Sequence, residues 1–418
     1  MGNQNKKYRP ESLMMSYGYE PSWSEGAIKC PIYQTSTFVF KTAEDGKHFF
    51  DVAQGRVEKQ PNEQPGLIYS RLNNPDLEIL ENRLCLWDKA EEAAVFESGM
   101  SAISTMLLAH LRPGDVLLHS NPVYGGSDHF IKHVLADFGV KAISFDPWHT
   151  ETEVKAIIEQ NDPKKLKMIY LETPANPTND LIDIEMCVRL AKEFSNEDKR
   201  VLTAVDNTYM GPVWQHPIKH GADLVLYSAT KYIGGHSDVI AGACLGSTEV
   251  MQPVRALRTF LGSMAGPWTG WLLMRSLETL KVRMDKQAEN AAKVAVFLNE
   301  HPKIEKVNYL GLLKPEDGRS YEIYQRQCST GGGMVSFHIK GGQEAAFRFL
   351  NNLKLAHLAV SLGSTESLAE HPATMTHADV DAELKEKMGI NGSLVRLSVG
   401  VEHYEDLIDD LSQALDKA

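Results

Sequence analysis

The sequence predicts an α/β fold in which a mostly parallel sheet is followed by a smaller α+β domain. Two observations lead to this prediction. Between about residues 75 and 245, short apolar runs alternate with segments of helical spacing, the pattern of a parallel sheet covered on both faces. After about residue 257 the alternation gives way to a long helical stretch and then to mixed strands and helices. A length of 418 residues fits about two or three domains.

The first 70 residues precede this alternation and look irregular. They contain five prolines and a polar run over 54–64, so a short strand over 37–40 is one of the few elements expected there. Both a loose arm that reaches a partner subunit and a plain surface loop fit such a composition.

Apolar runs and helical spacing define the elements of the first domain. The predicted helices cover residues 77–87, 100–111, 130–138, 151–160 and 184–194. The predicted strands cover residues 93–96, 116–119, 141–145, 168–171, 201–205, 224–227 and 240–245.

The C-terminal region begins with a helical stretch over 271–299 that lacks proline and glycine and forms either one helix, kinked or not, or two. Strands are then expected over 307–310, 334–339, 356–360 and 394–399. A helix is expected over 343–350, and an amphipathic helix over 404–415.

Charge and composition argue against several classes of protein. A net charge of −12 disfavours a general basic surface for nucleic-acid phosphates, although it leaves room for one local anion site. The chain has no run of about 18 apolar residues and no signal-peptide core. The five cysteines are scattered without C-x-x-C spacing, so we expect a cytoplasmic protein with unpaired core thiols and no metal site.

Polar residues follow several predicted strands, where parallel α/β sheets bind ligands. Ser98-Gly99-Met100 opens the helix after strand 93–96, and its amide groups fit either a phosphate or an ordinary helix cap. Two prolines around Asn176 fix a rigid turn after strand 168–171. Such a turn is more often structural than ligand-binding.

The next two strands end in more distinctive residues. Asp206 follows strand 201–205, where a buried carboxylate needs a partner such as a cationic ring nitrogen or a structural hydrogen bond or ion pair. Ser228, Thr230 and Lys231 follow strand 224–227; hydroxyls suit a phosphate, and a desolvated lysine can act as a nucleophilic amine. A phosphate cradle, a carboxylate for a pyridinium and a lysine for an aldehyde are together the parts that a pyridoxal phosphate enzyme needs.

The motifs resemble those of the Cys/Met-metabolism family of pyridoxal phosphate enzymes, the trans-sulfuration enzymes. The resemblance extends in order from about residue 15 to residue 415. The matching motifs include Tyr69-Ser70-Arg71, Tyr124-Gly125-Gly126, 172–177, 206–209, 228–232, Ser361-Leu362-Gly363, Met375-Thr376-His377 and 394–400. The resemblance implies fold type I, with an aspartate-aminotransferase-like large domain and a smaller C-terminal domain.

The resemblance assigns most of the cofactor site. It implies that Lys231 carries pyridoxal 5'-phosphate covalently and moves protons among the substrate carbons. Asp206 would pair with the ring nitrogen, and Tyr124 would stack on the ring and act as acid or base toward the leaving group. The phosphate would be held by Ser228, Thr230, Gly99, Met100, Tyr69 and Arg71.

Substrate binding and assembly follow from the same resemblance. Arg396 would clamp the α-carboxylate of an amino acid, with Asn176 and Ser361 nearby. Tyr69 and Arg71 would come from the neighbouring subunit of a homotetramer built as a dimer of dimers. The chain would then consist of an arm over 1–70, a large cofactor domain over 71–256 and a C-terminal domain over 257–418. No nucleic acid, membrane or metal is expected as a partner.

A few positions bear on the reaction. Family members that handle cystathionine usually have a glutamate just before the Ser-Leu-Gly motif, where this chain has Val360, which suits the S-methyl group of methionine. Methionine γ-lyases, however, typically have a cysteine where this chain has Gly126. The loop 262–271, which contains two tryptophans, and the long segment 39–68 also depart from the family pattern.

We therefore expect a lyase that catalyses γ-elimination on a sulfur amino acid, methionine γ-lyase-like, giving a 2-oxo acid, ammonia and a thiol. Two alternatives stay open: γ-replacement on an O-acylhomoserine, as in cystathionine γ-synthase or O-acylhomoserine sulfhydrylase, and cystathionine γ-lyase activity. The spacing from Ser228 to Lys231 disfavours an aminotransferase. The intact set Lys231, Asp206, Tyr124 and Arg396 disfavours a non-enzymatic binding protein.

Overall fold

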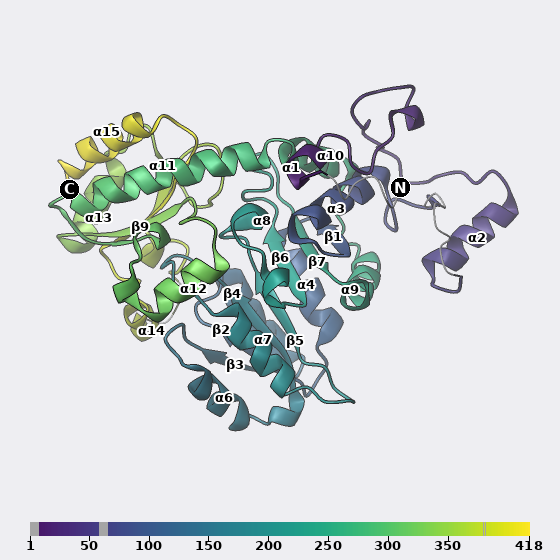
Figure 1. Ribbon diagram of the computed structural model, residues 1–418, viewed down its shortest axis with the longest axis horizontal. Helices are drawn as coiled ribbons and strands as arrows, with labels where there is room; N and C mark the ends of the chain where they lie inside the picture. The colour runs from purple at the N-terminus through teal and green to yellow at the C-terminus, as the bar shows by residue number, and fades with distance from the viewer. Residues whose placement is uncertain (1–7, 58–65, 379, 381) are drawn as a thin grey trace.

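Two sheets organise the computed structural model, which describes residues 8–57, 66–378, 380 and 382–418. A seven-stranded sheet occupies the middle of the chain and a five-stranded sheet the C-terminal part, with the long helix α11 (Leu280–Glu300) running along the C-terminal side (Figure 1). Residues 1–7 and 58–65, which belong to the expected arm, lie outside the described residues.

The seven-stranded sheet has the order β1-β7-β6-β5-β4-β2-β3. Its strands are β1 (Glu92–Phe96), β2 (Val116–Ser120), β3 (Lys141–Phe145), β4 (Leu166–Glu172), β5 (Leu202–Asp206), β6 (Leu224–Ser228) and β7 (Gly242–Gly246). Strand β7 pairs antiparallel with β1 and β6, and the remaining neighbours pair parallel. The expected mostly parallel sheet is therefore confirmed, and the carboxyl ends of six strands meet at one edge.

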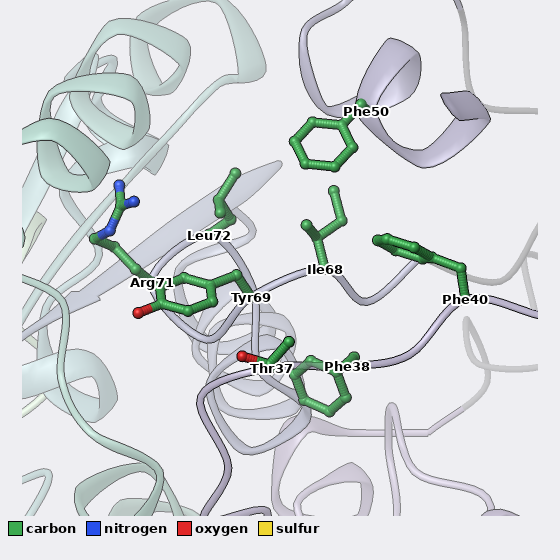
Figure 2. A pocket seen from close by; sticks show the side chains of 8 residues that line it. All are labelled: Thr37, Phe38, Phe40, Phe50, Ile68, Tyr69, Arg71 and Leu72. Atoms are coloured by element: carbon green, nitrogen blue, oxygen red, sulfur yellow. The ribbon is translucent and has the colours of Figure 1, made fainter. Parts of the chain in front are cut away.

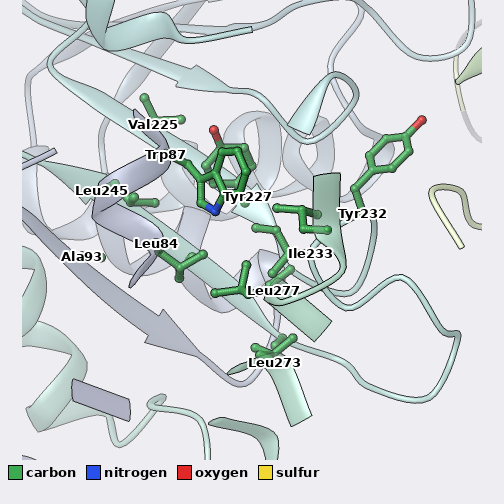
Figure 3. Close-up of a cluster of buried hydrophobic side chains, with 14 of the residues drawn as sticks. Leu84, Trp87, Ala93, Val225, Tyr227, Tyr232, Ile233, Leu245, Leu273 and Leu277 are labelled. Atoms are coloured by element: carbon green, nitrogen blue, oxygen red, sulfur yellow. The ribbon is translucent and has the colours of Figure 1, made fainter. Parts of the chain in front are cut away.

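Helices cover both faces of this sheet, because side chains of successive strand residues point to opposite faces. On one face Leu224 and Leu226 pack with α4 (Gly99–His110), α9 (Thr248–Leu261) and the π-helix η3 (Phe130–Leu135). The opposite face is covered by α3 (Pro75–Asp88), α10 (Pro267–Leu277), α6 (Glu151–Glu159) and α7 (Ile184–Glu193). Figure 3 shows part of this second core, with Trp87 of α3 close to Tyr227 of the sheet.

Most helices and strands lie where the sequence predicts them, and the exceptions have physical reasons. Helix α9 was not expected, because Pro253 interrupts the helical pattern, yet Val250 and Val254 bury one face of this helix on the sheet. The predicted helix 130–138 corresponds to η3, and α5 (Gly125–His129), which was not predicted, comes directly before it. The expected domain division after residue 256 falls inside α9.

The five-stranded sheet has the order β10-β11-β12-β9-β8. Its strands are β8 (Ile304–Asn308), β9 (Met334–Ile339), β10 (His357–Leu358), β11 (Leu368–Glu370) and β12 (Leu394–Ser398). Helices α11, α13 (Gly342–Asn351) and α15 (Tyr404–Leu415) pack on it. The helical stretch 271–299 proves to be two helices, α10 and α11, which separate at Glu278 and Thr279.

Sequence reasoning did not predict strand β11, helix α12 (Arg319–Gln327) or helix α14 (Ala382–Lys387). Strand β11 has only three residues, and both helices are rich in charged and polar residues, so none of the three stood out as an apolar run. The strand expected over 356–360 is reduced to the two residues of β10.

The described part of the N-terminal arm is extended and carries few elements. Helix α1 (Pro10–Leu13) contacts α3, whereas α2 (Ala43–Ala53) projects away from the body (Figure 1). The strand expected over 37–40 is reduced to a single bridge between Thr37 and Tyr69. Within the described residues, no helix is both long and apolar enough to span a bilayer.

Candidate active site

The carboxyl edge of the large sheet gathers the polar residues that follow its strands. Glu172 and Asp206 are the last residues of β4 and β5 and are paired in register. Ser228 ends β6 in the next position of the sheet. Parallel strand direction thus brings together residues that are more than 50 positions apart in the sequence.

Lys231 follows β6 and points toward the C-terminal domain. Its Nζ donates a hydrogen bond to Oγ of Ser361 at 2.8 Å. Burial and, to a smaller extent, the nearby Arg396 lower the pKa of Lys231 from 10.5 to about 8, and Glu370 opposes the shift. The lysine therefore has a much larger fraction of free, nucleophilic amine near neutral pH than an exposed lysine has.

Asp206 is a buried carboxylate, 5% exposed. Its Oδ1 accepts the N–H of Thr208 at 3.0 Å, and the hydroxyl of Tyr170 donates to its Oδ2 at 3.4 Å. Burial raises the pKa of Asp206. None of the partners that the structure describes for this carboxylate is a cation, so a protonated ring nitrogen is the kind of partner that its setting fits.

A close backbone approach builds the expected phosphate cradle. Helix α4 begins at Gly99, and Ser98 caps it by accepting the N–H of Ser101 at 3.0 Å. A Cβ at Gly99 would lie 2.9 Å from Cβ of Ser228, so only glycine lets the helix start come this close to the end of β6. The N–H groups of Gly99 and Met100 thereby lie next to the Ser228 hydroxyl, an arrangement that suits a phosphate.

Thr230 lies in the turn after β6, but its hydroxyl is already engaged. Its Oγ1 donates to the carbonyl of Ala241 at 3.2 Å and accepts the N–H of the same residue at 3.0 Å. This reciprocal pair fixes the turn that holds Lys231.

Arg396 of β12 approaches from the C-terminal domain and is 2% exposed. Its Nη1 lies 2.7 Å from Oε1 of Glu370 and donates to Oδ1 of Asn176 at 2.9 Å. Its Nη2 donates to the carbonyl of Ser361 at 2.7 Å. Its Nε is buried without a hydrogen-bond partner. The N–H groups of Nε and Nη2 can therefore donate two parallel hydrogen bonds to one carboxylate.

Tyr124 precedes α5 and is 46% exposed, and its backbone N–H donates to Oε2 of Glu172 at 2.6 Å. A Cβ at Gly126 would lie 2.7 Å from Cε1 of Tyr124 and 3.1 Å from Sδ of Met100. The tyrosine ring therefore lies close to the N-terminus of α4. Val360, 53% exposed, adjoins Ser361 at the site.

Sequence reasoning missed two carboxylates of the site. Glu172 was noted only as part of a motif, and Glu370 was not singled out. Each is the last residue of an apolar strand, Glu172 of β4 and Glu370 of β11. An acidic residue directly after an apolar run could therefore have identified both from the sequence.

Tyr69 and Arg71 belong to a different region of the chain. The guanidinium of Arg71 lies 5.5 Å from the ring centre of Tyr69 and donates to the carbonyl of Thr259 at 3.2 Å. Both line an open apolar pocket of the arm together with Thr37, Phe38, Phe40, Phe50, Ile68 and Leu72 (Figure 2). None of the contacts that the structure describes for this pair is with Lys231, Asp206 or Ser228.

The group at the sheet edge defines a class of enzyme. An amine of lowered pKa, a buried carboxylate, a hydroxyl beside a helix start and an arginine with a free donor edge are suited to pyridoxal phosphate and an amino acid substrate. Among the described residues, no cluster of three or more His, Cys, Asp or Glu side chains could hold a metal ion. The chain belongs to the Cys/Met metabolism PLP-dependent enzymes, a family whose pattern its residues 11–416 match.

Individual relatives agree with this assignment. The chain is 42% identical over 394 residues to the L-methionine γ-lyase of Fusobacterium nucleatum subsp. polymorphum, covering 94% of each protein. It is 39% identical to the cystathionine γ-lyase of Sus scrofa, covering 96% of this chain and 92% of that protein. The crystal structure of metB from Corynebacterium glutamicum superposes with a TM-score of 0.86 at 36% identity, covering 98% of both chains. The expected fold type I and the pyridoxal phosphate cofactor are confirmed.

Proposed function

We propose that this enzyme catalyses γ-elimination on a sulfur-containing amino acid, with methionine as the preferred substrate. One water is consumed, and a 2-oxo acid, ammonia and a thiol are released. The observation that carries the choice of substrate is Val360, an exposed apolar side chain beside Ser361. An apolar group there suits an S-methyl group better than it suits the distal ammonium group of cystathionine. Similarity to L-methionine γ-lyases supports the same choice.

Arg396 binds the substrate carboxylate through its Nε and Nη2 edge. Asn176 and Ser361 hold the guanidinium in place, since each accepts one of its N–H groups. Burial of this arginine strengthens the ion pair with the incoming carboxylate because water does not compete for it.

Lys231 and Tyr124 move the protons of the reaction. Pyridoxal phosphate, when bound, supplies the electron sink that makes the protons on Cα and Cβ of the substrate removable. The Lys231 amine, whose pKa lies at about 8, takes up and returns these protons. Tyr124, exposed toward the site, protonates the departing sulfur. Asp206 keeps the ring nitrogen protonated.

The cofactor phosphate is held from two subunits. Ser228 and the N–H groups of Gly99 and Met100 contribute from one chain, in which Thr230 fixes the turn after β6. Tyr69 and Arg71 contribute from a neighbouring chain. The exposure of the arm and its apolar pocket support such an exchange. We propose that the enzyme is a cytoplasmic homotetramer, a dimer of dimers, with an arm over 1–70, a cofactor domain over 71–256 and a C-terminal domain over 257–418.

Product analysis tests the proposed reaction. The purified enzyme is incubated separately with methionine, cystathionine, cysteine and an O-acylhomoserine plus a thiol, with Lys231→Ala as the control. We expect 2-oxobutyrate and methanethiol from methionine. Release of 2-oxobutyrate from cystathionine but not from methionine would contradict the choice of substrate, and a new thioether from the O-acylhomoserine would establish γ-replacement instead.

Cystathionine γ-lyase activity is the second candidate because cystathionine γ-lyases are also among the relatives. Replacement of Val360 by glutamate should shift the ratio of kcat/KM values toward cystathionine by on the order of tenfold, the value of one charge-assisted hydrogen bond. Val282→Glu, an exposed change on α11, is the matched control and should leave this ratio unchanged. If both variants behave alike, Val360 does not select the substrate.

A further inference from the structure

Glu172 is a buried carboxylate whose two oxygens bind backbone amides from two different loops. Its Oε2 accepts the N–H of Tyr124, at the start of α5, at 2.6 Å. Its Oε1 accepts the N–H of Asn176, in the loop after β4, at 3.3 Å. One side chain thus connects the loop of the aromatic ring with the loop of the substrate-binding amide.

Contacts with the neighbouring strands of the sheet fix the position of this carboxyl group. Glu172 is the last residue of β4, pairs in register with Asp206, and donates its own N–H to Oγ of Ser120 at the end of β2. Since it is only 5% exposed, water does not compete for its oxygens. The two amides are therefore anchored to a rigid element and not to solvent.

The connection continues into the C-terminal domain. The Oδ1 atom of Asn176 accepts from Nη1 of Arg396, and this same Nη1 is paired with Glu370. A continuous series of contacts therefore runs from Tyr124 through Glu172 and Asn176 to Arg396. Movement of the Asn176 loop would displace the donor edge that faces the substrate carboxylate.

We propose that Glu172 is a positioning residue that fixes Tyr124 and Asn176 relative to each other and so sets the distance between the cofactor-facing ring and the carboxylate-binding arginine. This inference rests on the roles assigned above to Tyr124, Asn176 and Arg396. Burial and the neighbouring Asp206 raise the pKa of Glu172, whereas the two amide hydrogen bonds lower it and so favour the ionised form that accepts both.

The informative variant is Glu172→Gln, because glutamine has the same shape but one acceptor oxygen instead of two. At least one of the two amides then faces an NH2 group. Glu159→Gln, on the exposed end of α6, is the matched control. Hydrogen exchange measured by mass spectrometry on the full-length holoenzyme reports directly on the peptides that cover 121–127 and 173–179.

We expect faster exchange in at least one of the two peptides of Glu172→Gln, with no change in β2. We also expect binding of norleucine, an amino acid without a leaving group, to weaken by on the order of tenfold, as for loss of one buried hydrogen bond. Unchanged exchange in both peptides, or unchanged norleucine binding, would overturn the proposal. If Glu172→Gln does not fold, Glu172→Asp, which withdraws the carboxyl group by one methylene, carries the same test.

These measurements separate the positioning role from the proposed reaction. Exchange rates and norleucine affinity need no turnover, so they test Glu172 even if the wild-type enzyme cleaves no sulfur amino acid. A KM for methionine that rises with the norleucine dissociation constant, while the cofactor absorbance at saturation is unchanged, agrees with positioning. Loss of cofactor from Glu172→Gln with normal loop exchange would contradict it.

Discussion

Cofactor binding is assigned to two regions, the sheet edge and the N-terminal arm with the residues that follow it. The two regions differ sharply in the burial and hydrogen bonding of their site residues. At the sheet edge, Asp206, Arg396 and Lys231 are largely buried, and each is held by specific hydrogen bonds. In the arm, Tyr69 is 39% exposed, and Arg71, directly after the arm, is held by one described hydrogen bond, to a backbone carbonyl.

This contrast supports the proposed division of the cofactor site between two chains. Buried side chains that hydrogen bonds already orient are preorganised, so they need no further ordering before they bind or react. Exposed aromatic and basic side chains around an open apolar pocket are typical of surfaces that another chain covers. We therefore expect changes at the sheet edge to act within one subunit and changes in the arm to act across two.

The largest effect is expected for Lys231→Ala. Removal of the Lys231 amine, which donates to Ser361, should lower kcat by about 10³-fold or more, because both covalent binding and proton transfer depend on it. The measurement is release of 2-oxo acid, together with loss of the cofactor absorbance that survives dialysis in the wild type. Retention of that absorbance would move the covalent attachment to another lysine.

Mixing two inactive variants tests the division between the two regions. Lys231→Ala lacks the amine, and Arg71→Ala lacks the arm's phosphate contact. If the site is shared, a hybrid dimer has one intact site, and random reassembly should restore about a quarter of wild-type activity. The mixture is unfolded, refolded together and assayed against each variant refolded alone. Activity no higher than that of Arg71→Ala alone would place Arg71 in its own chain's site.

The site residues at the sheet edge could be predicted from sequence because each directly follows a recognisable strand. A buried apolar strand followed at once by Asp206 or by Ser228 implies where these groups lie, since parallel strands end together. Helix starts are equally local, as Ser98 and Gly99 show.

The missed parts depend on contacts between distant segments. Glu370 meets Arg396 only because the short strand β11 pairs with β12, and Glu172 meets an amide 48 positions away. Neither contact leaves a period or spacing in the sequence. We propose that Tyr69 and Arg71 act in a neighbouring subunit, and a contact between chains likewise leaves no period in the sequence.

A smaller effect is expected on the pH dependence of cofactor uptake, which tests the pKa of Lys231 at the sheet edge. Because burial lowers the pKa of Lys231 to about 8, the free amine prevails above that pH. The rate at which the cofactor-free enzyme takes up pyridoxal phosphate should rise about tenfold per pH unit below 8 and level off above it. Nα-acetyl-lysine, the control, should keep accelerating to about pH 10. Without a plateau near pH 8, Lys231 would behave as an exposed lysine.

The smallest effect on activity, and a distinct effect on stability, is expected for Asp88→Asn behind the sheet edge. Asp88 is fully buried and accepts from the hydroxyl of Tyr227 at 2.7 Å. Burial raises the pKa of Asp88 from 3.8 to about 7, and the Tyr227 hydrogen bond opposes the shift. Between these two values the unfolded chain loses the proton while the folded chain keeps it, so wild-type stability falls as pH rises through this window.

Asparagine cannot ionise and still offers an oxygen to Tyr227, so Asp88→Asn escapes this loss. The difference in unfolding free energy between variant and wild type should shift in favour of the variant from pH 4 to pH 8, by about 4 kcal/mol at most. Asp51→Asn in the arm is the control of opposite sign, because Lys47 and Arg56 lower the pKa of Asp51 and that contribution is lost as pH falls. Equal pH profiles for the two variants, measured by denaturant unfolding, would mean that the pKa values of Asp88 and Asp51 are not shifted in opposite directions.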